Sequence, residues 1–344
     1  MSRAISESAC RGLSLIELLV ASALGLLLTA GIAALYMEYK LQYFHDEQLA
    51  RLQENGRYAT RLLSRELAMA GFFAGSLSAE EIAAVSIGSD CNADRWALDA
   101  TSPLGVVDDY SPPGAVVTTA GTPLACLEGA TVAAGTDMLT IKRTAALASL
   151  EDGAIAPGLS ASSSDRWFLR VQSDRVPDWR KLRPIDLISL ARSGEAADWW
   201  QAVAKIFYVR RYSDPDNSSD GLPTLCMEAL VSDAMTTRCL VEGVENLQFE
   251  LGVDSDGDGV ADRFLSAPQR GEMDRIVAAR FFLLLRSLSP VAGYRNDRSY
   301  QLGGLVVPAK SDGFLRRVFS ATVSLRNKVR LIGGEPGEAG YDIG

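Results

Sequence analysis

Residues 11–35 read RGLSLIELLVASALGLLLTAGIAAL, a run as apolar as a membrane anchor apart from one carboxylate, Glu17. From Leu13 to Leu35 Glu17 is the only ionisable side chain, and these 23 residues would extend about 35 Å as a helix. A helix of that length crosses a hydrocarbon core of about 30 Å. The run therefore predicts a membrane-spanning helix that carries one charge near its N-terminal end.

The flanking charges and the overall composition predict the orientation of the chain. Arg3 and Arg11 precede the helix, and short loops with positive charge stay on the cytoplasmic side of a membrane. The 344 residues are 47% hydrophobic, which is enough for one large or two modest packed domains. We expect a single pass through a membrane, with a cytoplasmic N-terminus and an extracytoplasmic globular head.

The cysteines are distributed in agreement with this orientation. Cys10 precedes the apolar helix, whereas Cys91, Cys126, Cys226 and Cys239 follow it. Exported cysteines pair in an oxidising compartment, and four of them allow three connectivities. Proximity in the sequence favours the Cys91–Cys126 and Cys226–Cys239 pairs without excluding the other two connectivities.

Glu17 needs a partner, because a charge in the apolar part of a membrane helix costs about 2.5–3.5 kcal/mol on insertion scales. The chain offers no cation between Arg11 and Lys40. Cleavage after Gly12 would create one, since the new amino group of Leu13 carries a positive charge. Glu17 of a neighbouring subunit could then pair with that amino group.

This segment resembles the processing motif of type IV pilins and pseudopilins, and the residues that carry the resemblance are Gly12, Leu13, Ser14, Leu15, Ile16 and Glu17. The resemblance implies that a prepilin peptidase cuts between Gly12 and Leu13 and methylates the amino group of Leu13. It also implies that Glu17 guides subunit packing in the filament. Leu13 replaces the usual phenylalanine of the family, and Ser14 replaces the usual threonine.

The helical pattern continues beyond the apolar run. Apolar residues recur every three or four positions among charges from Tyr36 to Ala70, and no proline occurs before Pro103. Gly71 is a plausible stop. The expected division is a leader (1–12), a transmembrane half of the helix (13–35), an amphipathic half (36–70) and a β-rich periplasmic head (71–344).

The segment NGRYATRLLSRELAMAGFF, residues 55–73, resembles the stretch that follows the membrane helix in PilW-like minor pilins. The resemblance implies an α+β, type IV pilin-like fold in which the long helix packs on a large antiparallel sheet. It also implies a minor pilin that primes assembly of a type IV pilus and lies in the fibre, at or near the tip. The implied partners are other minor pilins, the major pilin and a PilY-type tip adhesin.

The head carries short β-prone runs. Two of them, GAVVTT (114–119) and DMLTIKR (137–143), lie in a part that is rich in small residues. From residue 166 onward the runs are longer and predict an antiparallel sheet. They are RWFLRVQ (166–172), AKIFYVRRY (204–212), TLCMEALV (224–231), NLQFELGV (246–253), AARFFLLLRS (278–287) and RRVFSATVSLRN (316–327).

A second motif, VDSDGDGVADRF (253–264), has the spacing of a calcium loop, and its expected ligands are Asp254, Asp256, Asp258, the carbonyl of Val260 and Asp262. Gly259 allows the sharp turn at position six. Position twelve is Leu265, where a bidentate glutamate is expected, so we predict weak Ca²⁺ binding unless Glu272 or Asp274 completes the shell. The alternative is a solvated hairpin turn built on Asp-Gly chemistry.

The remaining features do not favour catalysis. His45 is the only histidine, so neither a Ser-His-Asp triad nor a multi-histidine zinc site can form. Trp199 and Trp200 are expected to pack in the core from opposite faces of a strand. The basic run that begins at Arg316 and Arg317 is expected on the solvated face of the last strand, and a net charge of −9 opposes nucleic-acid binding.

Four alternatives stay open. A signal peptide has a shorter apolar core of about 7–15 residues, and a plain membrane anchor would not need Glu17. A minor pseudopilin of a type II secretion system shares the processing motif, but its large tip member typically lacks the glutamate. A membrane-anchored, Ca²⁺-dependent adhesin that does not polymerise would share the helix and the aspartate loop.

Overall fold

The structure is a computed structural model, and it describes residues 14–74, 79–92, 95–112, 114–157, 159, 162–194, 196–218 and 220–327. The chain divides into two compact units, Met1–Ala50 and Arg51–Gly344.

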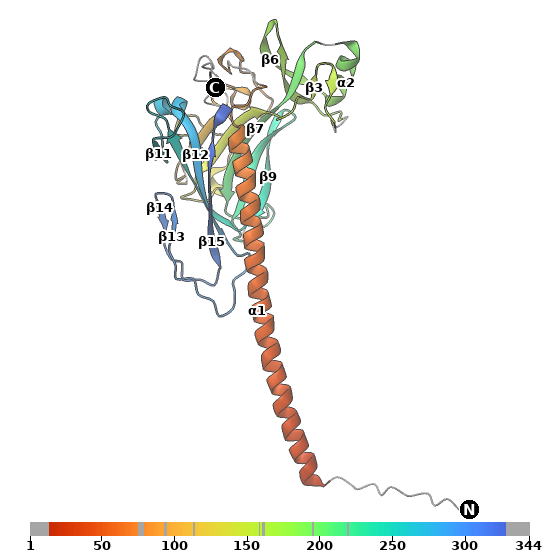
Figure 1. Ribbon diagram of the computed structural model, residues 1–344, viewed down its shortest axis with the longest axis vertical. Helices are drawn as coiled ribbons and strands as arrows, with labels where there is room; N and C mark the ends of the chain where they lie inside the picture. The colour runs from red at the N-terminus through yellow and green to blue at the C-terminus, as the bar shows by residue number, and fades with distance from the viewer. Residues whose placement is uncertain are drawn as a thin grey trace, which may run out of the picture. The chain divides into compact units, whose positions relative to one another are not determined.

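One long helix, α1 (Leu15–Met69), begins in the first unit and ends in the second. Figure 1 shows it as a continuous ribbon, which confirms the predicted N-terminal helix. Side chains from Leu15 to Phe44 are exposed, and within this part of α1 an 18-residue window reaches a mean hydropathy of 2.3. Of the described helices, α1 alone is long and apolar enough to cross a membrane.

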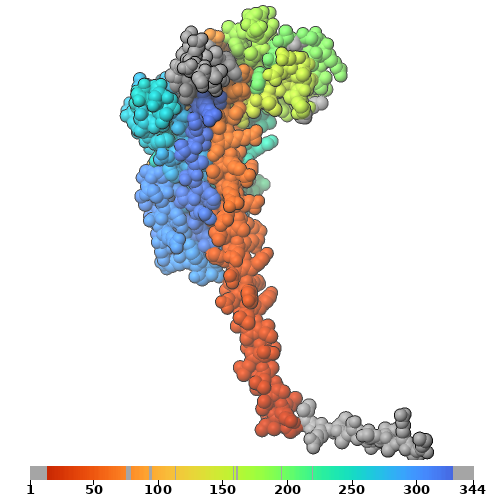
Figure 2. Space-filling model, in the orientation of Figure 1, coloured from red at the N-terminus to blue at the C-terminus, as the bar shows by residue number. Residues whose placement is uncertain are grey.

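In the second unit, the end of α1 packs on the head through small and apolar side chains. Leu52, Ala59, Leu63 and Leu67 recur on one face and are at most 2% exposed. Gly56 lies in the same stripe, and a Cβ at this position would overlap the ring of Phe319. Glycine therefore allows the close approach of α1 to strand β15, which Figure 2 shows lying along the orange part of the helix.

The helix ends where a glycine adopts the left-handed conformation. Gly71 has φ of +76°, and its N–H donates to the carbonyl of Lys142 at 3.1 Å instead of continuing the helix. The predicted stop at Gly71 is thus confirmed to within two residues.

The larger sheet has nine strands, and all its described ladders are antiparallel. Its central strand, β7 (Asp198–Arg210), contacts four neighbours because it is the longest. The other strands are β1 (Leu104–Val107), β2 (Met138–Thr144), β3 (Leu150–Glu151), β4 (Ala154–Ile155), β5 (Arg166–Gln172), β6 (Arg175–Leu182), β8 (Thr224–Val231) and β9 (Ala234–Glu242).

A second sheet has four strands in the order β11-β10-β12-β15. These strands are β10 (Val244–Val253), β11 (Arg263–Leu265), β12 (Ile276–Arg286) and β15 (Arg316–Ser324). A separate hairpin pairs β13 (Tyr300–Leu302) with β14 (Leu305–Val307). The predicted α+β fold, with a long helix and antiparallel sheets, is confirmed.

The longer apolar runs from residue 166 onward form strands as predicted, but the apolar pattern was not sufficient, because the apolar strand β1 was not predicted. GAVVTT forms no strand, and only Val117 makes an isolated bridge, to Pro123. The prediction missed β6 and β9, which are polar, and helix α2 (Pro184–Ser193), which has Pro184 in its first turn and Gly194 at its C-cap. Short 3₁₀ turns lie at Ala79–Glu81, Trp96–Leu98, Gly129–Thr131 and Arg270–Arg275.

Trp199 and Trp200 pack as predicted, from opposite faces of β7. Trp199 is 4% exposed in a small core with Phe168 and Leu187, whereas Trp200 packs against the main core and contacts Phe72 edge-on at 5.6 Å. Adjacent residues on a strand point to opposite faces, so the two indoles belong to different cores.

The prediction that the basic run of the last strand is solvated was wrong for Arg316. Its side chain is only 2% exposed, and its Nε lies 2.6 Å from Glu245 Oε2 while its Nη1 lies 2.6 Å from Asp312 Oδ1. A buried guanidinium is stable when carboxylates satisfy its donors. Asp312 lies only four residues before Arg316, but Glu245 lies 71 residues before it, so the strand pattern alone could not reveal the Glu245 pair. Arg317 is exposed, as predicted.

Candidate functional site

The N-terminal end of α1 places Glu17 in a capping box. Ser14 precedes the first helical residue, and its backbone N–H and hydroxyl donate to Glu17 Oε2 at 2.9 and 3.0 Å. The backbone N–H of Glu17 donates in return to Ser14 Oγ at 3.3 Å. This reciprocal arrangement satisfies donors that a helix start leaves without intrahelical partners.

The capping box gives Glu17 a local structural role that the sequence analysis missed. The signal was present, because Ser14 and Glu17 have the S-x-x-E spacing that marks a helix start before an apolar run. Both contacts use Oε2, and Glu17 itself is exposed. The predicted cleavage residues, Gly12 and Leu13, lie outside the described residues.

The aspartate motif forms the connection between β10 and β11, where Val253 pairs with Arg263. Gly257 and Gly259 have φ of +86° and +84°, a conformation that glycine adopts without steric cost. Asp254 organises the turn, because its Oδ1 accepts from Gly257 N–H at 2.6 Å and its Oδ2 accepts from Gly259 N–H at 2.8 Å. These amides hold the pKa of the Asp254 carboxyl below its usual value.

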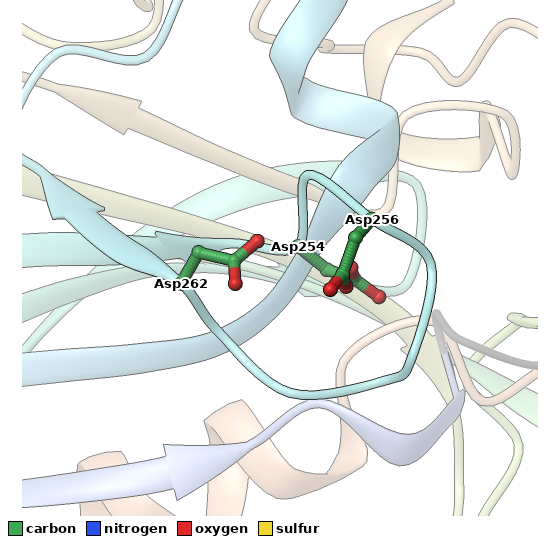
Figure 3. Close-up of side chains that lie close together, drawn as sticks. All are labelled: Asp254, Asp256 and Asp262. Carbon is green, nitrogen blue, oxygen red and sulfur yellow. The ribbon is translucent and has the colours of Figure 1, made fainter.

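Three of the predicted ligands converge. Asp254, Asp256 and Asp262 each offer an oxygen, and these oxygens all lie within 4.8 Å of one another (Figure 3). Calcium binds oxygen at 2.3–2.6 Å, so two ligands of one ion are separated by at most about 5 Å. The donor set therefore fits a calcium ion in both distance and chemistry.

Asp258, a fourth predicted ligand, makes a different contact. Asp258 Oδ1 accepts from the backbone N–H of Val260 at 2.7 Å, and Val260 is 65% exposed. Asp258 does not belong to the group of converging oxygens. Three of the four predicted aspartates therefore bring carboxylate oxygens close together.

The missing twelfth ligand is not supplied by Glu272. Its Oε1 accepts from Arg263 at 2.6 Å, and its Oε2 accepts from the backbone N–H of Gln269 at 2.8 Å. Leu265 occupies the twelfth position, at the end of β11. The loop as folded resembles an open, partial shell.

Two disulfide bonds cross-link segments within the head. Cys91 is bonded to Cys126, and Cys226 is bonded to Cys239, which is one of the three connectivities that the sequence allowed. Cys91 and Cys226 are fully buried, whereas Cys239 is exposed on β9. The first bond fixes a segment with little regular structure to the main core, and the second joins the neighbouring strands β8 and β9.

A buried ion triad joins the end of α1 to the larger sheet. Glu66 Oε2 accepts from Arg143 of β2 at 2.9 Å, and Glu66 Oε1 accepts from Lys205 of β7 at 2.6 Å. The side chain of Glu66 is 5% exposed. Burial raises the pKa of Glu66, but Lys205 and Arg143 lower it further, so the net pKa lies below the usual value and Glu66 is ionised.

Comparisons with known proteins find two similarities. Residues 206–327 match the family model of type IV pilus-assembly protein W, PilW. A type IV-like pilin from Thermus thermophilus has a similar solved structure, with 12% identity over 81% of this chain and 97% of the other, and a TM-score of 0.37. No curated protein matches the sequence.

The PilW match begins in β7, ends after β15 and includes the aspartate loop. It does not include α1, so this match is independent of the N-terminal motif. The predicted resemblance to PilW-like proteins of the type IV pilus is confirmed.

Proposed function

We propose that this protein is a minor pilin that is incorporated into a type IV pilus, at or near its tip, and primes assembly of the fibre. The observation that carries this proposal is a PilW match in the head together with an apolar helix whose first turn holds one carboxylate, Glu17. The proposed role is structural rather than catalytic. His45, the only histidine, lies on α1 beside Asp46 and not in a cluster of catalytic side chains.

The proposed life cycle has two stages. The unprocessed chain spans the inner membrane once through residues 13–35, with a cytoplasmic N-terminus and a periplasmic head. A prepilin peptidase then cleaves between Gly12 and Leu13, and the mature protein joins other minor pilins, the major pilin and a PilY-type tip adhesin. The single carboxylate supports this proposal, because a neighbouring subunit's free amino terminus would neutralise it.

Processing provides the first test. The mature protein is expected to begin at N-methylated Leu13 and to occur in sheared pilus fractions, whereas Gly12→Val should leave the chain uncleaved in the membrane. Intact mass and N-terminal analysis of both fractions measure this. A mature N-terminus beyond residue 30 would indicate signal-peptidase cleavage instead. Absence from pilus fractions would indicate an anchored protein that does not polymerise, and co-purified secretion components would indicate a pseudopilin.

We also propose that the aspartate loop binds Ca²⁺ through Asp254, Asp256 and Asp262. Three carboxylates whose oxygens lie within 4.8 Å repel one another unless a cation is bound, and the loop glycines allow the chain to wrap around an ion. With no twelfth ligand, the expected dissociation constant is about 10⁻⁴–10⁻³ M, which is the range of extracellular calcium modules.

Calcium is therefore expected to stabilise the head modestly. A cation that binds only the folded state adds RT ln(1 + [L]/Kd), so 1 mM Ca²⁺ should add on the order of 0.5–1.5 kcal/mol and raise the melting temperature by about 1–5 °C. The measurement is thermal melting of the detergent-solubilised protein in Ca²⁺ and in chelator. The double variant Asp254→Ala, Asp256→Ala should not respond.

A charge-matched control is the double variant Asp174→Ala, Asp216→Ala, which removes two exposed carboxylates outside the loop. It should respond to Ca²⁺ as the wild type does. Equal melting of the wild type in both buffers, with no bound metal in calorimetry, would leave the loop as a polar turn.

A further inference from the structure

A small cavity lies beside one edge of β7, between two strands that pair with different parts of that edge. Strand β5 pairs with β7 from Asp198 to Gln201, and β8 pairs with it from Lys205 to Arg210. Strand β2 and the chain after it occupy the opposite edge, since Ala145 N–H donates to the carbonyl of Gln201. The described pairings of β5 and β8 thus leave a gap at residues 202–204.

The cavity at this gap has a volume of about 310 Å³, at the lower end of the range for small-ligand pockets. Among its lining residues are Arg166 and Trp167 from β5, Gln201 from β7, Arg238 from β9, and the hydroxyls of Ser162 and Ser164. None of the described lining residues is a carboxylate. The other side of the cavity is apolar and is formed by the end of β8.

The two arginines differ from the other basic groups of this region because neither is paired with a carboxylate. Arg166 Nη1 donates to the neutral amide oxygen of Gln201 at 3.0 Å. Arg238 is exposed and has no partner among the residues that the structure describes. In contrast, Arg170 and Arg183 form ion pairs with Asp178 and Asp186. Both cavity arginines therefore keep free donors.

Two carboxylates adjacent in sequence to lining residues, Asp165 and Asp233, share one lysine, Lys181. Asp233 accepts from Lys181 Nζ at 2.7 Å and from the Trp167 indole N–H at 3.0 Å, and Asp165 lies 4.0 Å from Lys181. Together with Arg166 and Arg238, these groups leave the region with one net positive charge, although the whole chain has a net charge of −9. A local excess of one positive charge suits a monoanion.

We propose that this cavity binds a carboxylate, with Arg166 and Arg238 donating to its oxygens and the serine hydroxyls completing the shell. Guanidinium groups present planar forks that match carboxylate geometry. Neither β5 nor β8 pairs with Ala202 on this edge of β7, although β2 pairs with it on the opposite edge. The carboxylate could belong to an acidic sugar or to the C-terminus of a peptide, and both present the same group to the arginines.

The test is a binding titration of the full-length protein in detergent, followed by saturation-transfer NMR of the probe. The carboxylate probes are glucuronate and N-acetylglycylglycine, and the matched neutral probes are glucose and N-acetylglycylglycinamide. At least one carboxylate is expected to bind with a dissociation constant below about 1 mM and at least about tenfold more tightly than its neutral analogue. The probe that binds identifies the source.

Three variants test whether the arginines are responsible. Arg238→Gln and Arg166→Gln should each weaken binding at least about tenfold, because each removes charge-assisted hydrogen bonds. Arg175→Gln removes the same charge from the exposed β5–β6 hairpin outside the cavity and should leave binding unchanged. An unchanged melting temperature of Arg238→Gln is expected, since its side chain has no described partner to lose.

Four results would overturn the proposal. They are no saturable binding of either carboxylate up to about 10 mM, equal binding of the neutral analogues, tighter binding of inorganic phosphate than of both carboxylates, and full affinity in Arg238→Gln. An equal loss of carboxylate affinity in Arg175→Gln would also overturn the proposal. It would show that general surface charge, and not the cavity arginines, accounts for the binding.

Discussion

Replacing Glu17 with valine is expected to reduce the amount of this protein in sheared pili at least about tenfold, while the protein stays in the inner membrane. Valine removes an insertion cost of about 2.5–3.5 kcal/mol, so membrane insertion should be equal or better. It also removes the group that would pair with a neighbour's amino terminus in a low-dielectric filament core, where losing one partner of a charge pair costs several kcal/mol. Immunoblots of membrane and pilus fractions, in a strain without the wild-type copy, measure both effects.

The capping box requires a control, because Glu17→Val also breaks the contacts between Glu17 and Ser14. Ser14→Ala breaks the same box and keeps the carboxylate, at a cost of about 0.5–2 kcal/mol to the start of the helix. It should enter pili normally, whereas the nearly isosteric Glu17→Gln should be defective. Normal piliation by Glu17→Val, or an equal defect in Ser14→Ala, would contradict pairing of Glu17 with a neighbouring subunit. Glu17 would then act only as part of the helix cap.

The N-terminal helix could be predicted from the sequence because its information is local. Apolar residues at helical spacing predict the helix, and Gly71 predicts its end. The aspartate loop could be proposed as a calcium site for the same reason, since its candidate ligands lie within nine residues of the sequence. Even there, the structure shows Asp258 turned to the Val260 amide and Glu272 bound to Arg263, because tertiary neighbours compete for each carboxylate.

The polar strands could not be predicted from apolar patterns. Strand β6 contains Pro177, which usually argues against a strand, but β6 pairs only with β5, beside an irregular register, where a missing N–H is tolerated. Strand β9 has four consecutive exposed residues, from Thr236 to Cys239, so neither face carries an apolar signal. Pairing with β8 and the disulfide bond define it instead.

The arginine cavity and the buried ion pairs lie furthest from sequence-based prediction. Glu66 is separated from Arg143 by 77 residues and from Lys205 by 139. A charge in an amphipathic helix predicts a solvated face, and only the sheet that packs over Glu66 reverses that expectation. Arg316 is a similar case, because Glu245, which lies 71 residues away, helps a charged residue of a strand to be buried beside its near neighbour Asp312.

Glu66→Gln is expected to destabilise the head by about 3–5 kcal/mol and to lower its melting temperature by about 6–20 °C. Glutamine keeps the volume and one acceptor, but it leaves Arg143 and Lys205 as positive groups whose side chains are only 8% and 19% exposed. Buried charges without a counter-charge are far more costly than the pair that they replace. Thermal and denaturant unfolding of the detergent-solubilised protein measure the loss. Glu54→Gln, an exposed change on the same helix, should stay within about 0.5 kcal/mol of the wild type.

Two further measurements separate this mechanism from a loss of packing. The triple variant Glu66→Met, Arg143→Met, Lys205→Met removes the whole triad and should recover most of the stability, because apolar replacement of a complete buried ion group is often neutral or stabilising. The pH dependence has a defined sign, because the folded-state pKa of Glu66 lies below its ordinary value of 4.5. The stability contributed by ionised Glu66 is therefore present above about pH 4.5 and is lost as the pH falls through the lower folded-state pKa. The difference in unfolding free energy between wild type and Glu66→Gln should therefore become smaller in acid. If this difference is constant with pH, or if the triple variant is less stable than Glu66→Gln, the loss of stability is due to packing alone.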